Sequence, residues 1–229
     1  MKKNLNKEKT EKVIIFGNGQ MANLAHFYLT HDSPYEVAGF CVDKDFLKEN
    51  SFNNLPVVSF EDVEAIFSPH VFKMFIPISY KNVNKLRAKK YYQAKDKGYE
   101  LISYLSSKAT TWPGLVIGEN CFIFENNVIQ PFVEIGNNVI LWSGNHIGHH
   151  SKIKDHCFLA SHVVVSGRVT IEPYCFLGVN ATIRDNVVIE QSCVIGAGTL
   201  ILKSTTKNGV YIGPPAKLYS LPSDKLKNI

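Results

Sequence analysis

Aliphatic residues recur every six positions through the second half of the chain. Stepping by six from Ile117 to Ile201 meets fifteen positions, and each of them is Ile, Leu or Val. An amphipathic helix repeats at intervals of three and four residues and a simple strand at intervals of two, so neither explains a period of six. The aliphatic positions are Ile117, Ile123, Ile129, Ile135, Leu141, Ile147, Ile153, Leu159, Val165, Ile171, Leu177, Ile183, Ile189, Ile195 and Ile201.

A second column of small or β-branched residues lies four places after the first. Its members are Cys121, Asn127, Val133, Val139, Asn145, Ser151, Cys157, Val163, Val169, Cys175, Ala181, Val187, Cys193 and Thr199. Two such columns are typical of the hexapeptide repeat of a parallel β-helix, in which three hexads, or about 18 residues, make one rung. The pattern predicts about five rungs that begin at Pro113-Gly114 and end near residue 204. Four of the five cysteines fall in this column, so they are predicted to be small buried residues rather than reactive thiols.

The first hundred residues follow a different pattern, in which apolar runs alternate with helical segments. This alternation predicts a small parallel α/β sheet. The expected strands are Lys12 to Phe16, Glu36 to Val42 and Val71 to Ile76, and the expected helices run from the glycine turn to about Leu29, from Ser59 to Phe67 and from Asn82 to Lys97.

The glycine turn GNGQMA, which starts at Gly17, follows the first predicted strand and opens the first predicted helix. Backbone N–H groups at such a helix N-terminus can hold a diphosphate, and an acid after the second strand, here Asp43, can bind a ribose hydroxyl. The motif ends in alanine rather than glycine and is weak by itself, so a tight turn without a ligand is the alternative. About a hundred residues cannot hold both a dinucleotide and a substrate domain, which favours a nucleotide-sugar over a nicotinamide cofactor.

Composition narrows the remaining possibilities only modestly. The net charge is +5, and much of it lies in residues 1–12 and 81–97, interpreted as a solvated tail and a solvated helix face. A basic face that attracts a phosphorylated small molecule is a second interpretation, and nucleic acid is not expected as a partner because no aromatic stacking pattern accompanies the charge. The sequence shows no apolar run of roughly 20 residues, no signal peptide and no CxxC pair, so a cytoplasmic protein without a membrane span is expected.

Five of the eight histidines lie between Gly144 and His162. They could form a metal site, supply a general base, or occupy polar corners of the coil. Metal ligands on one chain of a β-helix would stack at multiples of about 18 residues, and no pair among these five has that spacing, so no metal is expected. His146, His156 and His162 are interpreted as polar turn or interface residues.

The whole chain resembles the bacterial nucleotide-sugar acyltransferases that join a Rossmann-like domain to a left-handed β-helix. The resemblance rests on GNGQMA, on GFCVDKD, on the hexapeptide array and on GVYIGPPAK at residues 209–217. The group includes the bacillosamine- and perosamine-type N-acetyltransferases and the proteins described as sialic-acid O-acetyltransferase-like. It implies a Rossmann-like domain over residues 1–105, a left-handed β-helix domain over residues 106–229, and a homotrimer.

The resemblance also implies a reaction and the residues that carry it. The amine of a nucleotide-linked amino sugar would attack the thioester of acetyl-CoA between two subunits, with His149 as general base. Imidazole suits this role because its ordinary pKa lies near neutrality. His150 stands where the family often has an acid that orients the base, so that role would fall to His150, to Asp155 or to a carboxylate of the adjacent subunit. The acyl-donor positions are Gly167, whose N–H would meet the thioester carbonyl, together with Val179, Ala197 and Phe158, the last in place of a family histidine.

In the N-terminal domain, the resemblance places the diphosphate at Asn18, Gly19 and Gln20 and the nucleoside near Asp43 and Lys44. Ser79-Tyr80 stands where the family often has Gly-Asn, which leaves the sugar and the base (UDP, dTDP or GDP) open. Two other functions stay open: O-acetylation of a sugar hydroxyl with the same base, and a non-catalytic or metal-binding β-helix that keeps the nucleotide domain as a sensor.

Overall fold

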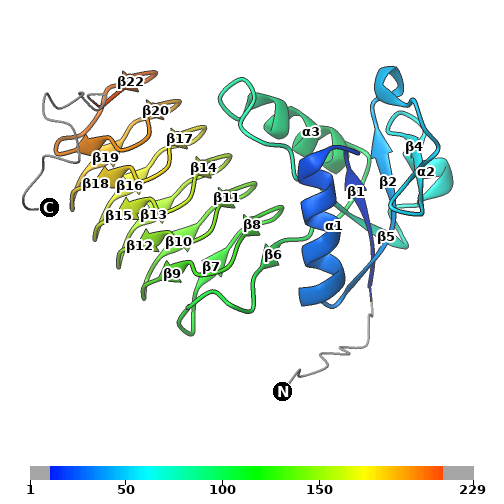
Figure 1. Ribbon diagram of the computed structural model, residues 1–229, viewed down its shortest axis with the longest axis horizontal. Helices are drawn as coiled ribbons and strands as arrows, with labels where there is room; N and C mark the ends of the chain where they lie inside the picture. The colour runs from blue at the N-terminus through cyan, green and yellow to red at the C-terminus, as the bar shows by residue number, and fades with distance from the viewer. Residues whose placement is uncertain (1–10, 214–229) are drawn as a thin grey trace, which may run out of the picture.

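The computed structural model describes residues 11–213, which form a small α/β sheet and a long coil of stacked rungs. Figure 1 shows the sheet and its helices at one end of the coil, with the rungs stepping away from them in chain order. Within this range no helix combines the length and apolar character needed to cross a membrane. Residues 214–217 of the GVYIGPPAK segment and the first ten residues lie outside the described range.

The N-terminal sheet has the strand order β3-β4-β2-β1-β5, and all its strands are parallel except β3, which pairs antiparallel with β4. The predicted strands are confirmed as β1, β2 and β5, but β3 and β4 were not predicted. The predicted helix from Ser59 is wrong in its first half, because Ser59 ends β4 and pairs with β2. The elements are β1 (Glu11–Phe16), α1 (Gln20–Asp32), β2 (Tyr35–Val42), η1 (Lys44–Phe46), β3 (Ser51–Phe52), β4 (Leu55–Ser59), α2 (Val63–Ile66), β5 (Phe72–Phe75) and α3 (Lys85–Asp96).

The coil consists of two-residue strands arranged in three parallel sheets. Each strand pairs with the strand 18 residues later, as where Ile117 faces Ile135 and Ile135 faces Ile153. The first sheet holds β7 (Val116–Ile117), β10 (Glu134–Ile135), β13 (Lys152–Ile153), β16 (Thr170–Ile171) and β19 (Val188–Ile189). The second holds β6 (Tyr104–Leu105), β8 (Phe122–Ile123), β11 (Ile140–Leu141), β14 (Phe158–Leu159), β17 (Phe176–Leu177), β20 (Val194–Ile195) and β22 (Val210–Tyr211). The third holds β9 (Val128–Ile129), β12 (His146–Ile147), β15 (Val164–Val165), β18 (Thr182–Ile183) and β21 (Leu200–Ile201).

Both predicted columns fill the interior of the coil. The aliphatic positions from Ile123 to Ile201 are all buried and Ile117 is partly buried at the first rung, while every member of the small-residue column is buried. The cysteines of that column are confirmed as buried core residues. Burying an aliphatic side chain contributes roughly 1.5–3 kcal/mol, so these columns account for most of the cohesion of the coil.

The coil turns at three corners, where single residues adopt the left-handed conformation. Asn126, Phe132 and Asn138 are the corner residues of one rung, and the positions 18 residues later repeat the conformation at His150 and His156, with glycine at 144. Asparagine and glycine tolerate positive φ most readily, which explains the asparagines along the repeat. The coil extends beyond the predicted limits, because β6 pairs with β8 before Pro113 and β22 pairs with β20 after residue 204.

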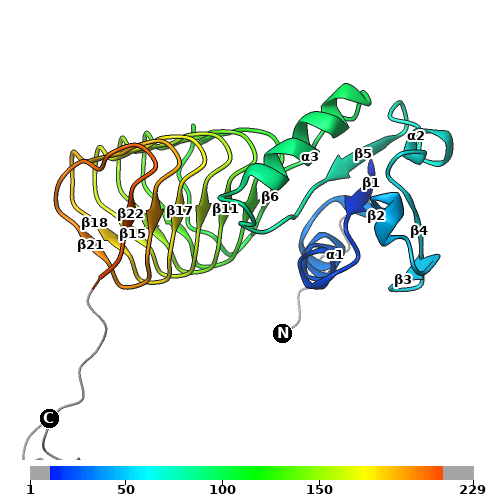
Figure 2. The same cartoon turned by 90° about the horizontal axis from the view of Figure 1, so that it is seen from above.

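Helix α3 packs against the first rungs of the coil, on the side that carries β6 and β11 (Figure 2). The interpretation of residues 81–97 as a solvated face is wrong for the inner side of this helix, where Arg87 is fully buried and Lys90 is buried. The Arg87 guanidinium donates to the carbonyls of Asn138, His156 and Cys157 on the coil. It also donates to the carbonyls of Ile78 and Ser79 in the N-terminal part, so one side chain joins the two parts.

Candidate active site

His149 and His150 lie at the corner between β12 and β13, and both are exposed. Their Nδ1 atoms are 3.1 Å apart, and the His149 backbone N–H donates to Gln130 Oε1 at 2.9 Å. One Nδ1 must carry the proton that the other accepts. If His149 donates, its Nε2 is free to accept a proton from a substrate.

Gly167 lies one rung above His149, as their separation of 18 residues requires. A Cβ at Gly167 would come within 2.8 Å of His149 Nε2 and Cε1, so the imidazole lies directly against the Gly167 backbone. The Gly167 N–H makes no hydrogen bond to another residue within 11–213. The structure therefore brings together a free ring nitrogen and a free backbone donor, the two groups that acyl transfer needs.

The structure distinguishes two of the candidates for orienting His149. Asp155 accepts the Asn137 N–H at 2.7 Å on another side of the coil, so its carboxylate is already engaged one rung below. His150 is the group in contact with His149, and its own ring packs on Phe132, with ring centroids 4.7 Å apart. Phe132 is highly exposed and stands in the left-handed conformation, which is strained for a side chain of this size.

Three of the four predicted acyl-donor residues line one cavity of about 380 Å³. The cavity is bounded by Tyr80, Trp142, Phe158, Ala160, Ser161, Phe176, Gly178, Val179 and Ala197. Phe158, Val179 and Ala197 were predicted, whereas the aromatic residues Tyr80, Trp142 and Phe176 were not. The Tyr80 ring lies 5.1 Å from Phe158 and 4.8 Å from Phe176 between centroids, so the Ser79-Tyr80 segment forms part of the wall.

Gly167 does not line this cavity. Within one chain, Ser161 of the cavity and Gly167 stand on opposite sides of β15, six residues apart, a span of at most about 20 Å. The cavity and the His149 corner therefore flank the third sheet of the coil on its two sides. That sheet carries exposed apolar side chains at Val128, Val164 and Leu200.

The glycine turn forms as predicted at the carboxyl end of β1. Gly17 has φ +108° and donates its N–H to the Cys41 carbonyl at 2.7 Å, which sets the turn beside the end of β2. Helix α1 starts at Gln20 after Gly19, with no side-chain cap and no acid in its first turn. A Cβ at Gly19 would meet nothing within 4 Å, so the N-terminal N–H groups of α1 face open space.

Asp43 and Lys44 follow β2 at the same edge of the sheet, so they lie near Asn18 and Gln20 as predicted. Asp43 is not free, because its Oδ1 is paired with Lys90 of α3. The Lys90 ammonium also lies 5.3 Å from the Phe16 ring centroid and 5.0 Å from that of Phe60. Sequence reasoning missed Lys90, because a lysine among six others between residues 81 and 97 gives no local signal.

The remaining histidines separate as their positions suggest. His156 is buried, its Nδ1 lies 2.8 Å from Asn138 Nδ2 and its Nε2 lies 3.0 Å from the Tyr92 hydroxyl. Burial lowers the pKa of His156 to about 4, so this ring is neutral at pH 7. His146 is partly exposed and His162 is exposed. Among residues 11–213 no three His, Cys, Asp or Glu side chains are grouped as metal ligands.

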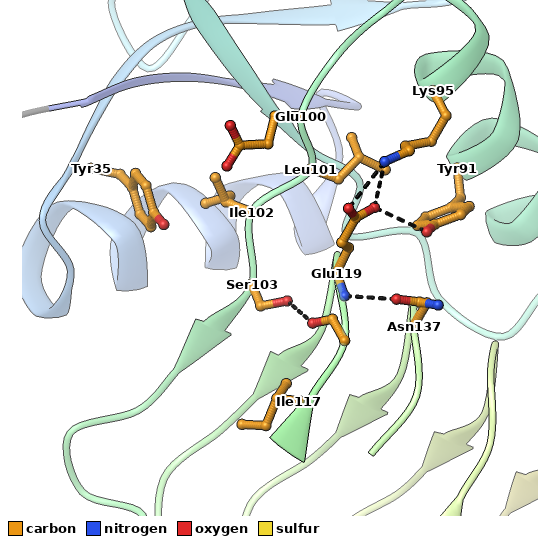
Figure 3. Close-up of a pocket in the computed structure, with 11 residues that line it drawn as sticks. Tyr35, Tyr91, Lys95, Glu100, Leu101, Ile102, Ser103, Ile117, Glu119 and Asn137 are labelled. Carbon is orange, nitrogen blue, oxygen red and sulfur yellow. Dashed lines mark hydrogen bonds and ion pairs between the residues drawn. The ribbon is translucent and has the colours of Figure 1, made fainter. Parts of the chain in front are cut away.

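A second cavity, of about 520 Å³, lies between the first rung of the coil and α3 (Figure 3). Its charged groups are paired with one another: Glu119 accepts from Lys95 at 2.8 Å and from the Tyr91 hydroxyl at 3.1 Å, and its backbone N–H donates to Asn137. None of the predicted site residues lines this cavity. It contributes to the junction of the two parts.

Comparison with known proteins agrees with the coil. Residues 114–149 and 168–203 match the family described as bacterial transferase hexapeptide (six repeats). No curated protein sequence matches the chain.

Solved structures match almost the whole chain. A histidine-to-asparagine variant of perosamine N-acetyltransferase from Caulobacter crescentus, in complex with CoA and GDP-perosamine, is 23% identical over 91% of this chain and 97% of its own, with a TM-score of 0.79. The acetyltransferase domain of PglB from Neisseria gonorrhoeae is 20% identical over 91% of this chain and 99% of its own, with a TM-score of 0.76. WeeI from Acinetobacter baumannii is 19% identical over the same shares, with a TM-score of 0.69. The chain therefore carries the bacterial transferase hexapeptide repeat in two segments and shares the two-part fold of these acetyltransferases.

Proposed function

We propose that the protein is an acetyl-CoA-dependent N-acetyltransferase that acts on a nucleotide-linked amino sugar, as in the synthesis of a surface glycan precursor. One observation carries the proposal: the exposed imidazole of His149 lies against the Gly167 backbone, whose N–H is free. The matching fold of the perosamine N-acetyltransferase, a structure that contains CoA and GDP-perosamine, supports it.

In the proposed reaction the sugar amine attacks the thioester carbonyl carbon while His149 Nε2 accepts the amine proton. The negative charge that develops on the carbonyl oxygen is stabilised by the Gly167 N–H. Collapse of the tetrahedral intermediate breaks the carbon–sulfur bond, and the thiolate of CoA leaves with a proton from His149. His150 holds the tautomer of His149 through the Nδ1–Nδ1 contact of 3.1 Å. No acyl-cysteine is formed, in keeping with the burial of every cysteine within the described residues.

The N-terminal part is proposed to be a Rossmann-like domain that binds the acceptor. The diphosphate would lie on Gly17, Asn18, Gly19 and Gln20, where the N–H groups at the start of α1 are open. Asp43 and Lys44 would contact the nucleoside. The Asp43 oxygen that Lys90 does not hold is the one we assign to the ligand.

We propose a division into domains at residues 1–105 and 106–229 and a cytoplasmic homotrimer of left-handed coils. In this trimer the third sheet of each coil faces its neighbours, so that its exposed apolar residues Val128, Val164 and Leu200 become covered. The His149 corner of one subunit would then meet the cavity of Phe158, Val179 and Ala197 on the next. This explains why one chain holds the two halves of the site on opposite sides of that sheet.

The test is a thiol-release assay with acetyl-CoA and a panel of UDP-, dTDP- and GDP-linked amino sugars. We expect CoA release with one acceptor, its loss in His149→Asn and its retention in His162→Asn, a matched change at another exposed corner histidine. Release with a hydroxy sugar only would establish O-acetylation instead. Silence across both panels from a folded protein that binds no CoA would reject the proposal.

A further inference from the structure

Basic residues are distributed unevenly over the coil. Six lysines and arginines lie between residues 114 and 213. Lys152 and Lys154 form ion pairs with Glu134 and Glu172 at 2.9 and 2.6 Å, each from a neighbouring rung. Arg168, Arg184 and Lys203, which we term the basic column, are exposed and form no salt bridge with any described residue. Unpaired cations gathered on one edge are available to an anionic ligand.

The basic column rises from the His149 corner. Arg168 follows Gly167, one rung above His150, and its N–H donates to the His149 carbonyl at 2.9 Å. Arg184 directly follows β18 and Lys203 lies two residues after β21, so they occupy the next two rungs of the same corner. The corner also holds one acid, Asp185, which accepts from the Asn186 side chain at 2.6 Å. Three cations and one anion leave a net charge of +2 along this edge.

The proposed acyl donor has a fixed direction on this surface. Its thioester lies at Gly167, and the wall residues Val179 and Ala197 stand in the rungs of Asp185 and Lys203, because each pair is separated by six residues within one rung. The donor therefore extends toward the C-terminal end of the coil. From the thioester sulfur to the diphosphate, the pantetheine arm has about 13 bonds, or roughly 15 Å when extended.

That length matches the height of the basic column. Stacked strands lie about 4.8 Å apart, so the three rungs from His149 to Lys203 span about 14 Å. A donor with its carbonyl at Gly167 would therefore bring its phosphates level with Arg184 and Lys203. Guanidinium and ammonium groups are the side chains that bind phosphates most strongly.

We propose that Arg184 and Lys203, with Arg168 below them, bind the phosphates of the CoA moiety of the acyl donor. The inference rests on the proposed function and assigns residues that neither the sequence nor the fold comparison marks. The donor then enters from the C-terminal end of the coil and the acceptor from the N-terminal domain at the other end. The two substrates meet at the rung of His149.

The experiment compares Arg184→Ala/Lys203→Ala with the matched control Lys152→Ala/Lys154→Ala on another sheet of the same coil. Calorimetry measures the Kd for CoA and for 3′-dephospho-CoA, and turnover measures the KM for acetyl-CoA and for S-acetylpantetheine, which lacks the phosphates. We expect the CoA Kd of the first variant to rise roughly tenfold for each lost charge, with S-acetylpantetheine unaffected. We expect wild-type values from the control, and near-wild-type values from Arg184→Lys.

Two outcomes would overturn the inference while leaving the proposed function in place. One is a CoA Kd for Arg184→Ala/Lys203→Ala equal to that of the wild type. The other is an equal loss with S-acetylpantetheine, which would show that the substitutions disturb the corner itself. If the wild-type protein binds no CoA, the proposed function and the inference fail together.

Discussion

Arg87→Met removes a charged group that is wholly buried between the two parts of the chain. The guanidinium donates to five backbone carbonyls and to the side-chain oxygens of Asn84 and Asn138, with no carboxylate among its partners. Methionine retains much of the apolar stem and leaves these acceptors without their donor. Burial lowers the pKa of Arg87 to about 9, so the side chain is still charged at pH 7.

The expected loss follows from two opposing effects. Each hydrogen bond to a charged group contributes about 1.5–3 kcal/mol, but desolvating the charge costs several kcal/mol, so the sum of the bonds overstates the effect. The Cys157 carbonyl also keeps the Ile140 N–H at 3.0 Å after the substitution. We therefore expect a decrease of about 3 kcal/mol in the free energy of unfolding, or about 6–12 °C in Tm for a chain of this size.

Urea unfolding measures this decrease with two independent signals. Both tryptophans, Trp112 and Trp142, belong to the coil side of the chain, so their fluorescence reports on the coil, whereas helical circular dichroism reports chiefly on the N-terminal domain. The matched control is Lys89→Met, which removes an exposed charge from the same helix. A loss below about 1 kcal/mol, no larger than that of the control, would refute the view that Arg87 joins the two parts.

Three other substitutions and one chemical probe examine the remaining features. His156 has its folded pKa depressed to about 4, so its contribution is complete above pH 6.5 and is lost as the pH falls toward 4. Urea midpoints should show the wild type losing about 2 kcal/mol more than His156→Gln between pH 7 and pH 5. Gly167→Ala would press its Cβ against the His149 ring, and we expect kcat to fall roughly 10–100-fold with unfolding little changed; an unaltered kcat would contradict the assigned site. Lys90→Met frees Asp43 and should raise the KM for the nucleotide-sugar roughly tenfold but leave the KM for acetyl-CoA unchanged; equal changes in both would indicate a folding defect. The five buried cysteines should react with a thiol reagent only as the protein unfolds, and fast labelling of any of them in the native state would contradict the packing of the core.

The coil could be predicted from the sequence because its cause is local and repeated. Every rung needs an aliphatic residue and a small residue at the same two places, so fifteen repetitions leave no other period. The β1–glycine turn–α1 unit was predictable for the same reason, since strand, turn and helix follow one another directly. Strand β4 was missed because LPVVS is a short apolar run that suits a strand or a helix equally.

The junction of the two parts could not be predicted, because it depends on contacts between distant residues. Arg87 meets Asn138 and Cys157 over separations of 51 and 70 residues, and Lys90 meets Asp43 over 47. In sequence these residues belong to a basic segment that looks solvated. Their burial follows only from the docking of α3 on the coil, which no local pattern encodes.

The same reasoning explains how function is distributed on this fold. The interior columns are fixed by packing, whereas the corner positions face outward and are free to carry chemistry. Residues 18 apart are neighbours in space, so a site on the coil follows a column and not a continuous motif. His149 with Gly167 is one such pair, and the dense histidine cluster around it separates into different corners once the coil forms. The basic column above Gly167 emerges from the same 18-residue comparison, although its members are spread over 36 residues of sequence and no motif connects them.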